Sequence, residues 1–143
     1  MRTFLGGGTG RLLVLAFERG EDLLEKTTEQ VKQAGIQNGV VISGIGTFDR
    51  ARLHRVTSFN EKPDEEFITI EAPMELSSVQ GIIAGGVPHL HFAFSDLEKT
   101  YSGHLEPGCR VLYLAELVIA EIPNMNLERE MAGHVKLLKR TNE

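Results

Sequence analysis

The stretch PHLHFAFSDLEKTYSGHL, residues 88–105, indicates two strands joined by a turn near residues 96–99. Alternate residues of a strand face the same side, so His89 and His91 are expected to point together. If the loop holds an even number of residues, position 91 lies opposite His104, and opposed side chains are only about 5 Å apart. An odd loop would turn His104 away, so the pattern leaves the register open.

Three imidazoles on one face form a ligand set for zinc, iron, nickel or copper. Three protein ligands with an open fourth position are typical of catalytic rather than structural zinc sites. The alternative is that these histidines pack half-buried in the sheet and hydrogen-bond to their neighbours. We interpret His89, His91 and His104 as a candidate metal site, and we expect His54 and His134, in more polar surroundings, to be surface residues.

Glu116 stands out because it interrupts the apolar run VLYLAELVIA, residues 111–120, which is typical of a central strand. A buried carboxylate is costly unless it is paired or coordinated. Glu116 could be a metal ligand, a hydrogen-bond partner of an imidazole, or half of an ion pair with Arg52 or Arg110.

The rest of the chain is dominated by strand patterns. The segments 11–17, 39–45, 51–56 and 110–122 are apolar or alternating, and the glycines at 44 and 46 suggest a bulge. One helix is predicted over residues 20–35. We therefore expect a single α+β domain over residues 1–143, with a central, mainly antiparallel sheet and the helix packed beside it. Its core would span about 11–122, and 123–143 would be a strand or tail.

Composition narrows the classes of function. The net charge is −5, and the one basic cluster is HVKLLKR, residues 134–140, which argues against autonomous DNA binding. No apolar run approaches the roughly 18–20 residues of a membrane span, so a cytoplasmic protein is expected. The single cysteine, Cys109, excludes an internal disulfide and a cysteine-based zinc cluster, and we expect it in the core. The glycine run LGGGTG, residues 5–10, lacks the Lys-Ser/Thr of a phosphate loop and predicts a turn.

Four segments together resemble the plants-and-prokaryotes-conserved (PPC) domain. They are GEDLLEKTTEQVKQAGIQNGVVISGIGTFDRARL, PHLHFAFSD, SGHLEPGCRV and AELVIAEI, and they cover the chain in order from about Arg11 to Ile122. The family usually has two glycines before its third histidine, and this chain has Ser102 in place of one. The resemblance implies a compact α+β fold and commonly a homotrimer. It places the family's histidines at His89, His91 and His104, and its strand glutamate at Glu116.

In plants this domain is fused to AT-hook motifs that read the minor groove of DNA. The present sequence contains no R-G-R-P core, so a DNA-binding function inherited from the family is doubtful here. We expect a homo-oligomeric, trimeric binding and interaction module whose His-lined pocket takes a divalent metal, most simply zinc. Its expected partners are itself, other proteins or a small ligand.

Two other functions stay open. One is a metal-dependent enzyme of the hydrolase or lyase class, in which the three histidines hold the ion and Glu116 acts as a base or orients a ligand. The other is a regulator that contacts DNA through Lys136, Lys139 and Arg140. The sequence selects no reaction for the first and ranks the second last.

Overall fold

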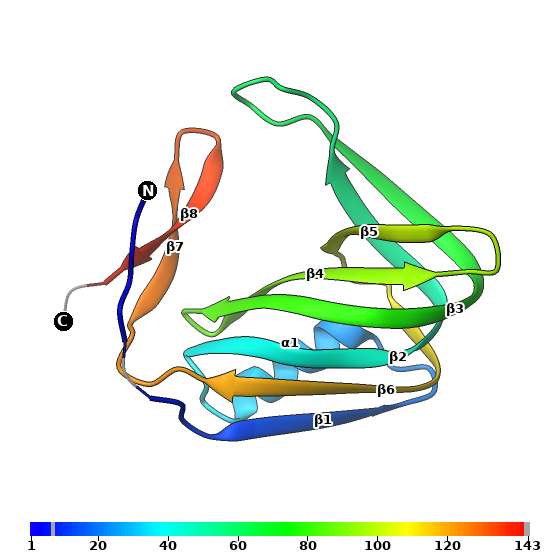
Figure 1. Ribbon diagram of the computed structural model, residues 1–143, viewed down its shortest axis with the longest axis horizontal. Helices are drawn as coiled ribbons and strands as arrows, with labels where there is room; N and C mark the ends of the chain where they lie inside the picture. The colour runs from blue at the N-terminus through cyan, green and yellow to red at the C-terminus, as the bar shows by residue number, and fades with distance from the viewer. Residues whose placement is uncertain (7, 142–143) are drawn as a thin grey trace.

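Antiparallel strands build almost all of the computed structural model, which describes residues 1–6 and 8–141 (Figure 1). A six-stranded sheet has the order β1-β6-β2-β3-β4-β5, and a separate two-stranded sheet is formed by β7 and β8. The elements are β1 (Leu12–Glu18), α1 (Leu23–Gln33), β2 (Asn38–Val56), β3 (Glu65–Ala84), β4 (Val87–Ser95), β5 (Thr100–Leu105), β6 (Arg110–Glu121), β7 (Leu127–Ala132) and β8 (Val135–Arg140).

The expected mainly antiparallel sheet with one helix is confirmed, but the fold is richer in β-structure than the sequence suggested. The segments 39–45 and 51–56 are parts of one 19-residue strand, β2, which pairs with the 20-residue β3. Register shifts interrupt the β2–β6 pairing between residues 41 and 43, 46 and 48, and 48 and 50. Such bulges bend a strand and increase its twist. The far end of β2 thereby also pairs with β5, through Leu53–Leu105 and His54–His104.

Helix α1 covers one face of the sheet (Figure 1). It begins after Asp22, whose side chain accepts a hydrogen bond of 2.9 Å from the backbone N–H of Glu25. It ends before Gly35, which adopts a left-handed φ of 68°. Leu23, Thr27 and Val31 form its buried stripe. The opposite face of the sheet has no helix over it among the described residues.

The core between α1 and the sheet centres on three aromatic rings. Phe48 meets Phe92 and Phe94 edge-on, with ring centroids 6.2 and 6.4 Å apart. Cys109 is also buried, as expected. Burial raises the pKa of its thiol to about 12, and its sulfur hydrogen-bonds to the backbone of Arg52, so the thiol packs as a small apolar side chain.

The segment after β6, for which the sequence predicted a strand or tail, contains two strands that form a hairpin. Strands β7 and β8 pair from Leu127–Arg140 to Ala132–Val135. The backbone N–H of Leu127 donates a 2.8 Å hydrogen bond to the Asn38 side chain, which anchors the hairpin to the sheet.

The glycine run near the N-terminus lies outside the regular secondary structure that the structure describes. In the glycine run 5–10, residues 5, 6 and 8–10 belong to no helix or strand, and Gly7 lies outside the described residues. Among the residues described, no helix has the length and apolar character of a transmembrane span.

Candidate metal-binding site

The register of three strands places three histidines in one row. His91 lies opposite His104 in the β4–β5 pair, and His104 lies opposite His54 in the β2–β5 pair. The β4–β5 turn occupies residues 96–99, an even number, so of the two registers that the sequence left open the structure has the one with His91 opposite His104. His89 stands two residues from His91 and on the same side of β4.

His104 is the centre of the resulting cluster of four imidazoles. Its ring centroid lies 4.5 Å from that of His54, 4.8 Å from His89 and 5.3 Å from His91. The rings of His89 and His91 are 5.6 Å apart and nearly parallel. The expectation that His54 is a surface residue is wrong: its side chain is 18% exposed and is stacked on His104. His134 is exposed, as expected.

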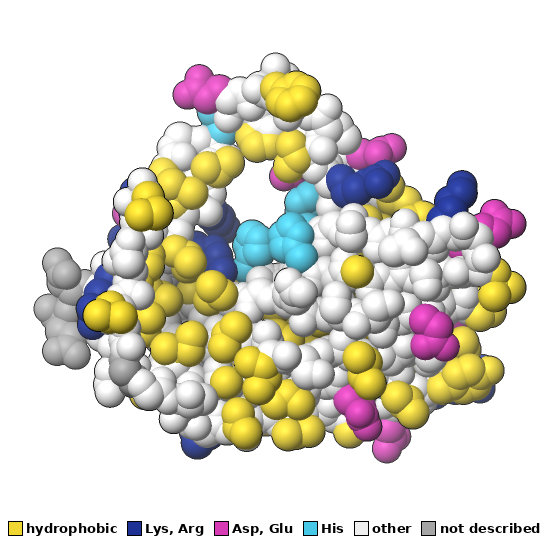
Figure 2. Space-filling model, viewed as in Figure 1, with side chains coloured by type: hydrophobic (Ala, Val, Ile, Leu, Met, Phe, Trp, Pro, Cys, Tyr) yellow, Lys and Arg dark blue, Asp and Glu magenta, His cyan; other side chains and the backbone are white. Residues whose placement is uncertain are grey.

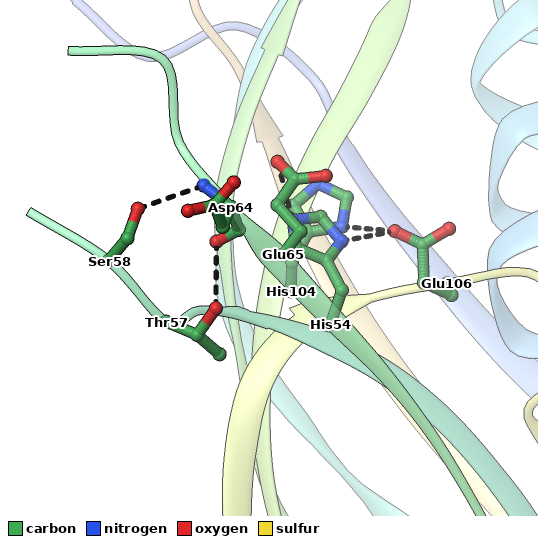
Figure 3. A network of polar contacts seen from close by, with 7 residues as sticks. All are labelled: His54, Thr57, Ser58, Asp64, Glu65, His104 and Glu106. Carbon is green, nitrogen blue, oxygen red and sulfur yellow. Dashed lines mark hydrogen bonds and ion pairs between the residues drawn. The ribbon is translucent and has the colours of Figure 1, made fainter. Parts of the chain in front are cut away.

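One carboxylate joins two of these rings (Figure 3). Oε1 of Glu106 lies 2.7 Å from Nδ1 of His54 and 2.9 Å from Nδ1 of His104. An ionised carboxylate only accepts hydrogen bonds, so each Nδ1 must carry the proton. The Nε2 of His104 then keeps a free lone pair. A carboxylate behind a metal-binding imidazole is the usual means of orienting the ring and raising its basicity.

Sequence reasoning missed Glu106, although a signal was present. It follows His104 by two residues, directly after β5, in the segment SGHLEPG, and a strand that continued to this residue would put its side chain on the same side as the imidazole. The strand periodicity that grouped His89 with His91 could have grouped Glu106 with His104.

The role expected for Glu116 is contradicted by its position. Glu116 is exposed, because Ala115 and Leu117 on either side of it face the core. It lies on β6 opposite Ile45, which is nine residues before His54 on β2, and β2 and β3 separate β6 from the histidines of β4. Arg110, one of its two expected ion-pair partners, instead donates to Asp49 at 2.8 Å, and among the described residues Glu116 forms no ion pair with the other, Arg52. Glu116 is therefore neither buried nor close to the imidazoles.

The surroundings of His89, His91 and His104 favour the uncharged imidazole. Histidine side chains line the hollow in Figure 2, and His89 and His91 are accessible to solvent. Burial, with a contribution from the charge of Arg129, lowers the pKa of His89 to about 4. Burial also lowers the pKa of His91 and of His104, the latter against the opposing effect of Glu106. Neutral imidazole is the form that binds a metal ion.

Two overlapping sets of side chains offer the kinds of donor that bind a divalent metal, and among the described residues one of them has all its ligand atoms close together. One set consists of His89, His91 and His104. The other consists of His54, His104 and Glu106, whose ligand atoms all lie within 4.8 Å of one another. In the second set the close atoms are already joined by hydrogen bonds, so Glu106 serves there as a support for the rings. The first set leaves the supported ring of His104 available as a ligand.

A shallow cavity adjoins the histidines on the side of His91. It has a volume of about 280 Å³ and carries the polar side chains of Ser78, Gln80 and Ser102 beside His91. Gln80 is the direct cross-strand partner of His91. A small polar molecule would fit next to an ion held by the imidazoles.

Known proteins share this fold. A plant- and prokaryote-conserved (PPC) protein from Pyrococcus horikoshii has a TM-score of 0.82 at 23% identity, with 100% of both chains covered. A metal-containing protein from Archaeoglobus fulgidus has a TM-score of 0.80 at 19% identity over 99% of this chain and 100% of the other. A protein from Bacteroides thetaiotaomicron, provisionally assigned as DNA-binding, has a TM-score of 0.74 at 16% identity over 96% and 98% of the two chains.

A curated relative is the bifunctional protein GlmU of Synechococcus sp., which is 28% identical over 124 residues. The match covers 86% of this chain and 19% of that protein, so the chain spans about a fifth of the length of its curated relatives. The profile of the Plants and Prokaryotes Conserved (PCC) domain, the family abbreviated PPC above, matches residues 5–123. The chain belongs to the Plants and Prokaryotes Conserved domain family.

Proposed function

We propose that this chain is a homo-oligomeric binding and interaction module that holds a divalent metal, most simply zinc, on His89, His91 and His104. The observation that carries the proposal is the double hydrogen bond of Glu106. By accepting from Nδ1 of both His54 and His104, it leaves Nε2 of His104 free as a donor atom, on a ring whose centroid lies 4.8 and 5.3 Å from those of His89 and His91. The metal content of the structurally similar Archaeoglobus fulgidus protein supports the proposal.

Metal content of protein purified without a His-tag tests this function. The wild type should contain close to one equivalent of metal, and the His89→Ala/His91→Ala variant should contain none while keeping its fold. A wild-type protein that stays metal-free after incubation with zinc would overturn the metal part of the proposal.

The oligomeric part rests on the face of the sheet opposite α1. We call its apolar region the open face; it is defined by Leu12, Val14, Ile45 and Leu114, each at least 50% exposed. These side chains lie on β1, β2 and β6, on the side of the sheet that no helix covers. Contiguous exposed apolar patches mark interaction sites, and the exposed Glu116, opposite Ile45, lies on the same side of the sheet. A closed homotrimer would cover the open face of every subunit, and sedimentation as a monomer at micromolar concentration would contradict it.

A metal-dependent hydrolase or lyase is the second candidate function. The cavity beside His91, with Ser78, Gln80 and Ser102 on its wall, favours it because a substrate needs room next to the ion. A bound divalent ion lowers the pKa of a coordinated water to about 7. Glu116 has no part in this candidate, because it lies on β6, away from the histidines. Turnover of small phosphate or carboxylate esters that is lost with the metal would favour the enzyme.

Direct DNA binding has the weakest support, although a structural neighbour is provisionally assigned that function. The net charge is −5, and Lys139 is paired with Glu130 at 3.0 Å. Nucleic-acid affinity comes mainly from basic side chains on phosphates. Duplex DNA binding could be strongly salt-dependent and disappear when Lys136, Lys139 and Arg140 are replaced. That result would make DNA binding the best-supported function of the chain.

A further inference from the structure

Arg129 of β7 reaches from the C-terminal hairpin to the strand pair that carries His89. Its Nη2 donates a 3.1 Å hydrogen bond to the carbonyl of Ile82, and its Nη1 approaches the carbonyl of Val87 at 3.4 Å. Ile82 is the direct cross-strand partner of His89. The guanidinium is therefore held beside the first of the proposed metal ligands. In Figure 2, basic side chains lie next to the histidines in the hollow.

The charge of Arg129 is not neutralised within the described part of the chain. The carboxylates that form ion pairs with arginines there do so with Arg11, Arg50, Arg55 and Arg110, and none lies within 4.0 Å of the Arg129 guanidinium. The side chain is half-buried, and this burial lowers its pKa. A partly buried cation without a counterion is costly. Its two carbonyl contacts leave N–H groups unused, and a guanidinium presents such groups in a fork that matches carboxylate and phosphate oxygens.

The charges are arranged unevenly along the row of imidazoles. At one end, the carboxylate of Glu106 contacts His54 and His104, and Oε1 of Glu65 lies 3.7 Å from Nε2 of His54 (Figure 3). At the other end, Arg129 lies beside His89. An anion that approaches a metal ion in this cluster is repelled at the His54 end and attracted at the His89 end.

We propose that the chain binds a small oxyanion, a carboxylate or a phosphate, between the metal and Arg129. One oxygen of the anion takes the metal's open position, and another accepts hydrogen bonds from the guanidinium. This inference rests on the proposed metal site and names the class of ligand that the site takes. Charge-assisted, two-point contacts of this kind are among the stronger and more selective hydrogen bonds in proteins.

The test uses cobalt(II) in place of zinc, because its visible absorption reports changes in the ligands of the ion. Full-length, cobalt-loaded protein in chloride-free buffer is titrated with inorganic phosphate and, separately, with malonate. We expect a saturable spectral change with at least one anion, and the comparison of the two distinguishes phosphate from carboxylate. Arg129→Met should raise the apparent Kd roughly tenfold or more, since a hydrogen bond to a charged group is lost. Arg129→Lys keeps the positive charge but loses the forked geometry of the guanidinium, so its apparent Kd should lie between those of the wild type and of Arg129→Met.

Lys139→Met is the matched control. It removes the same charge from the same hairpin, but Lys139 lies opposite Glu128 on β7, one position away from Arg129, and so faces the other side of the hairpin. Its apparent Kd should stay within about twofold of the wild-type value. The anion-free cobalt spectrum and the circular dichroism of Arg129→Met establish that the metal site and the fold are intact.

The outcomes separate the two proposals. Wild-type protein that binds no cobalt would overturn the metal site, and the anion site with it. Cobalt binding without any spectral response to either anion would overturn the anion site alone. So would an Arg129→Met variant with a wild-type Kd and a lowered Tm, because Arg129 would then act only as an anchor for the hairpin.

Discussion

His54 and His104 are direct cross-strand partners, and their rings stack with centroids 4.5 Å apart while both Nδ1 atoms approach the same oxygen of Glu106. The two residues are far apart in the sequence, and they meet because the bent end of β2 pairs with β5. The ring of His104 is therefore oriented by stacking on His54 as well as by its own hydrogen bond to Glu106. It also makes Glu106 the residue whose change tests the site most directly.

Replacing Glu106 by Gln should weaken zinc binding roughly 10- to 100-fold without abolishing it, as expected for a carboxylate that supports a ligating imidazole. Competition with a chromophoric chelator measures the affinity. Glu116→Gln is the matched control, since it removes the same charge from an exposed position on β6, away from the histidines, and should leave the affinity unchanged. Complete loss of binding in Glu106→Gln would instead identify His54, His104 and Glu106 as the metal ligands.

Replacing Gly103 by Ala should loosen the contact between β2 and β5. A Cβ at this position would lie 2.7 Å from the carbonyl oxygen of His54 and 2.9 Å from Cδ1 of Leu53. Because one of these atoms belongs to the backbone, the strands must separate, at a cost of about 1–3 kcal/mol in the free energy of unfolding. Denaturant unfolding measures the loss, and zinc affinity should fall with it.

The neighbouring Ser102→Ala variant is the control for Gly103→Ala. Ser102 is exposed, so the free energy of unfolding should change by no more than about 0.5 kcal/mol. A Gly103→Ala protein as stable as the wild type, with unchanged zinc affinity, would show that the pairing of β2 with β5 does not need the close approach at this residue.

The metal-free protein should lose stability as the pH falls from about 6.5 to about 4. Burial, assisted by Arg129, lowers the pKa of His89 from 6.5 to about 4, so in this interval the unfolded chain binds a proton that the folded chain does not. The stability that His89 contributes above pH 6.5 is therefore lost as the pH passes through the folded-state pKa. Because the His89 ring is accessible, solvent screening reduces the loss of stability below what the pKa shift alone would give.

Urea unfolding of the protein in EDTA at several pH values measures this dependence, and His89→Gln isolates the histidine. The difference in unfolding free energy between pH 7 and pH 4 should be smaller in the variant than in the wild type. Equal differences in the two proteins would mean that His89 titrates normally in the fold.

Introducing a charge on the open face should break the oligomer. In Val14→Glu the carboxylate would occupy a position that is 66% exposed in the single chain and buried in the proposed trimer. An unpaired charge in an interface is costly, so sedimentation velocity should show a lower molar mass at the same concentration. Leu97→Glu is the control, because Leu97 is fully exposed at the β4–β5 turn and outside the open face. Identical sedimentation of the three proteins would exclude the open face as an interface.

Much of this protein could be predicted from local sequence alone. Asp22 and Gly35 bound the helix through their own capping and backbone geometry, and alternation along β4 puts His89 and His91 on the same side. Such features depend on neighbours along the chain or across one hairpin. Alternation of side chains in a strand and the conformation of a tight turn determine them without help from the rest of the fold.

The remaining features were decided by the tertiary structure. The pattern around Glu116 is apolar on both sides, yet only the packing of Ala115 and Leu117 on the core shows that Glu116 faces outward. His54 lies in a polar stretch and joins the imidazoles only because bulges bend β2 onto β5. A sequence pattern records which residues alternate, whereas burial and contact depend on which strands pair at long range. The three histidines were therefore recognisable from the sequence, and Glu106 could have been grouped with them by strand periodicity, whereas His54 and Arg129 join the site only through long-range pairing.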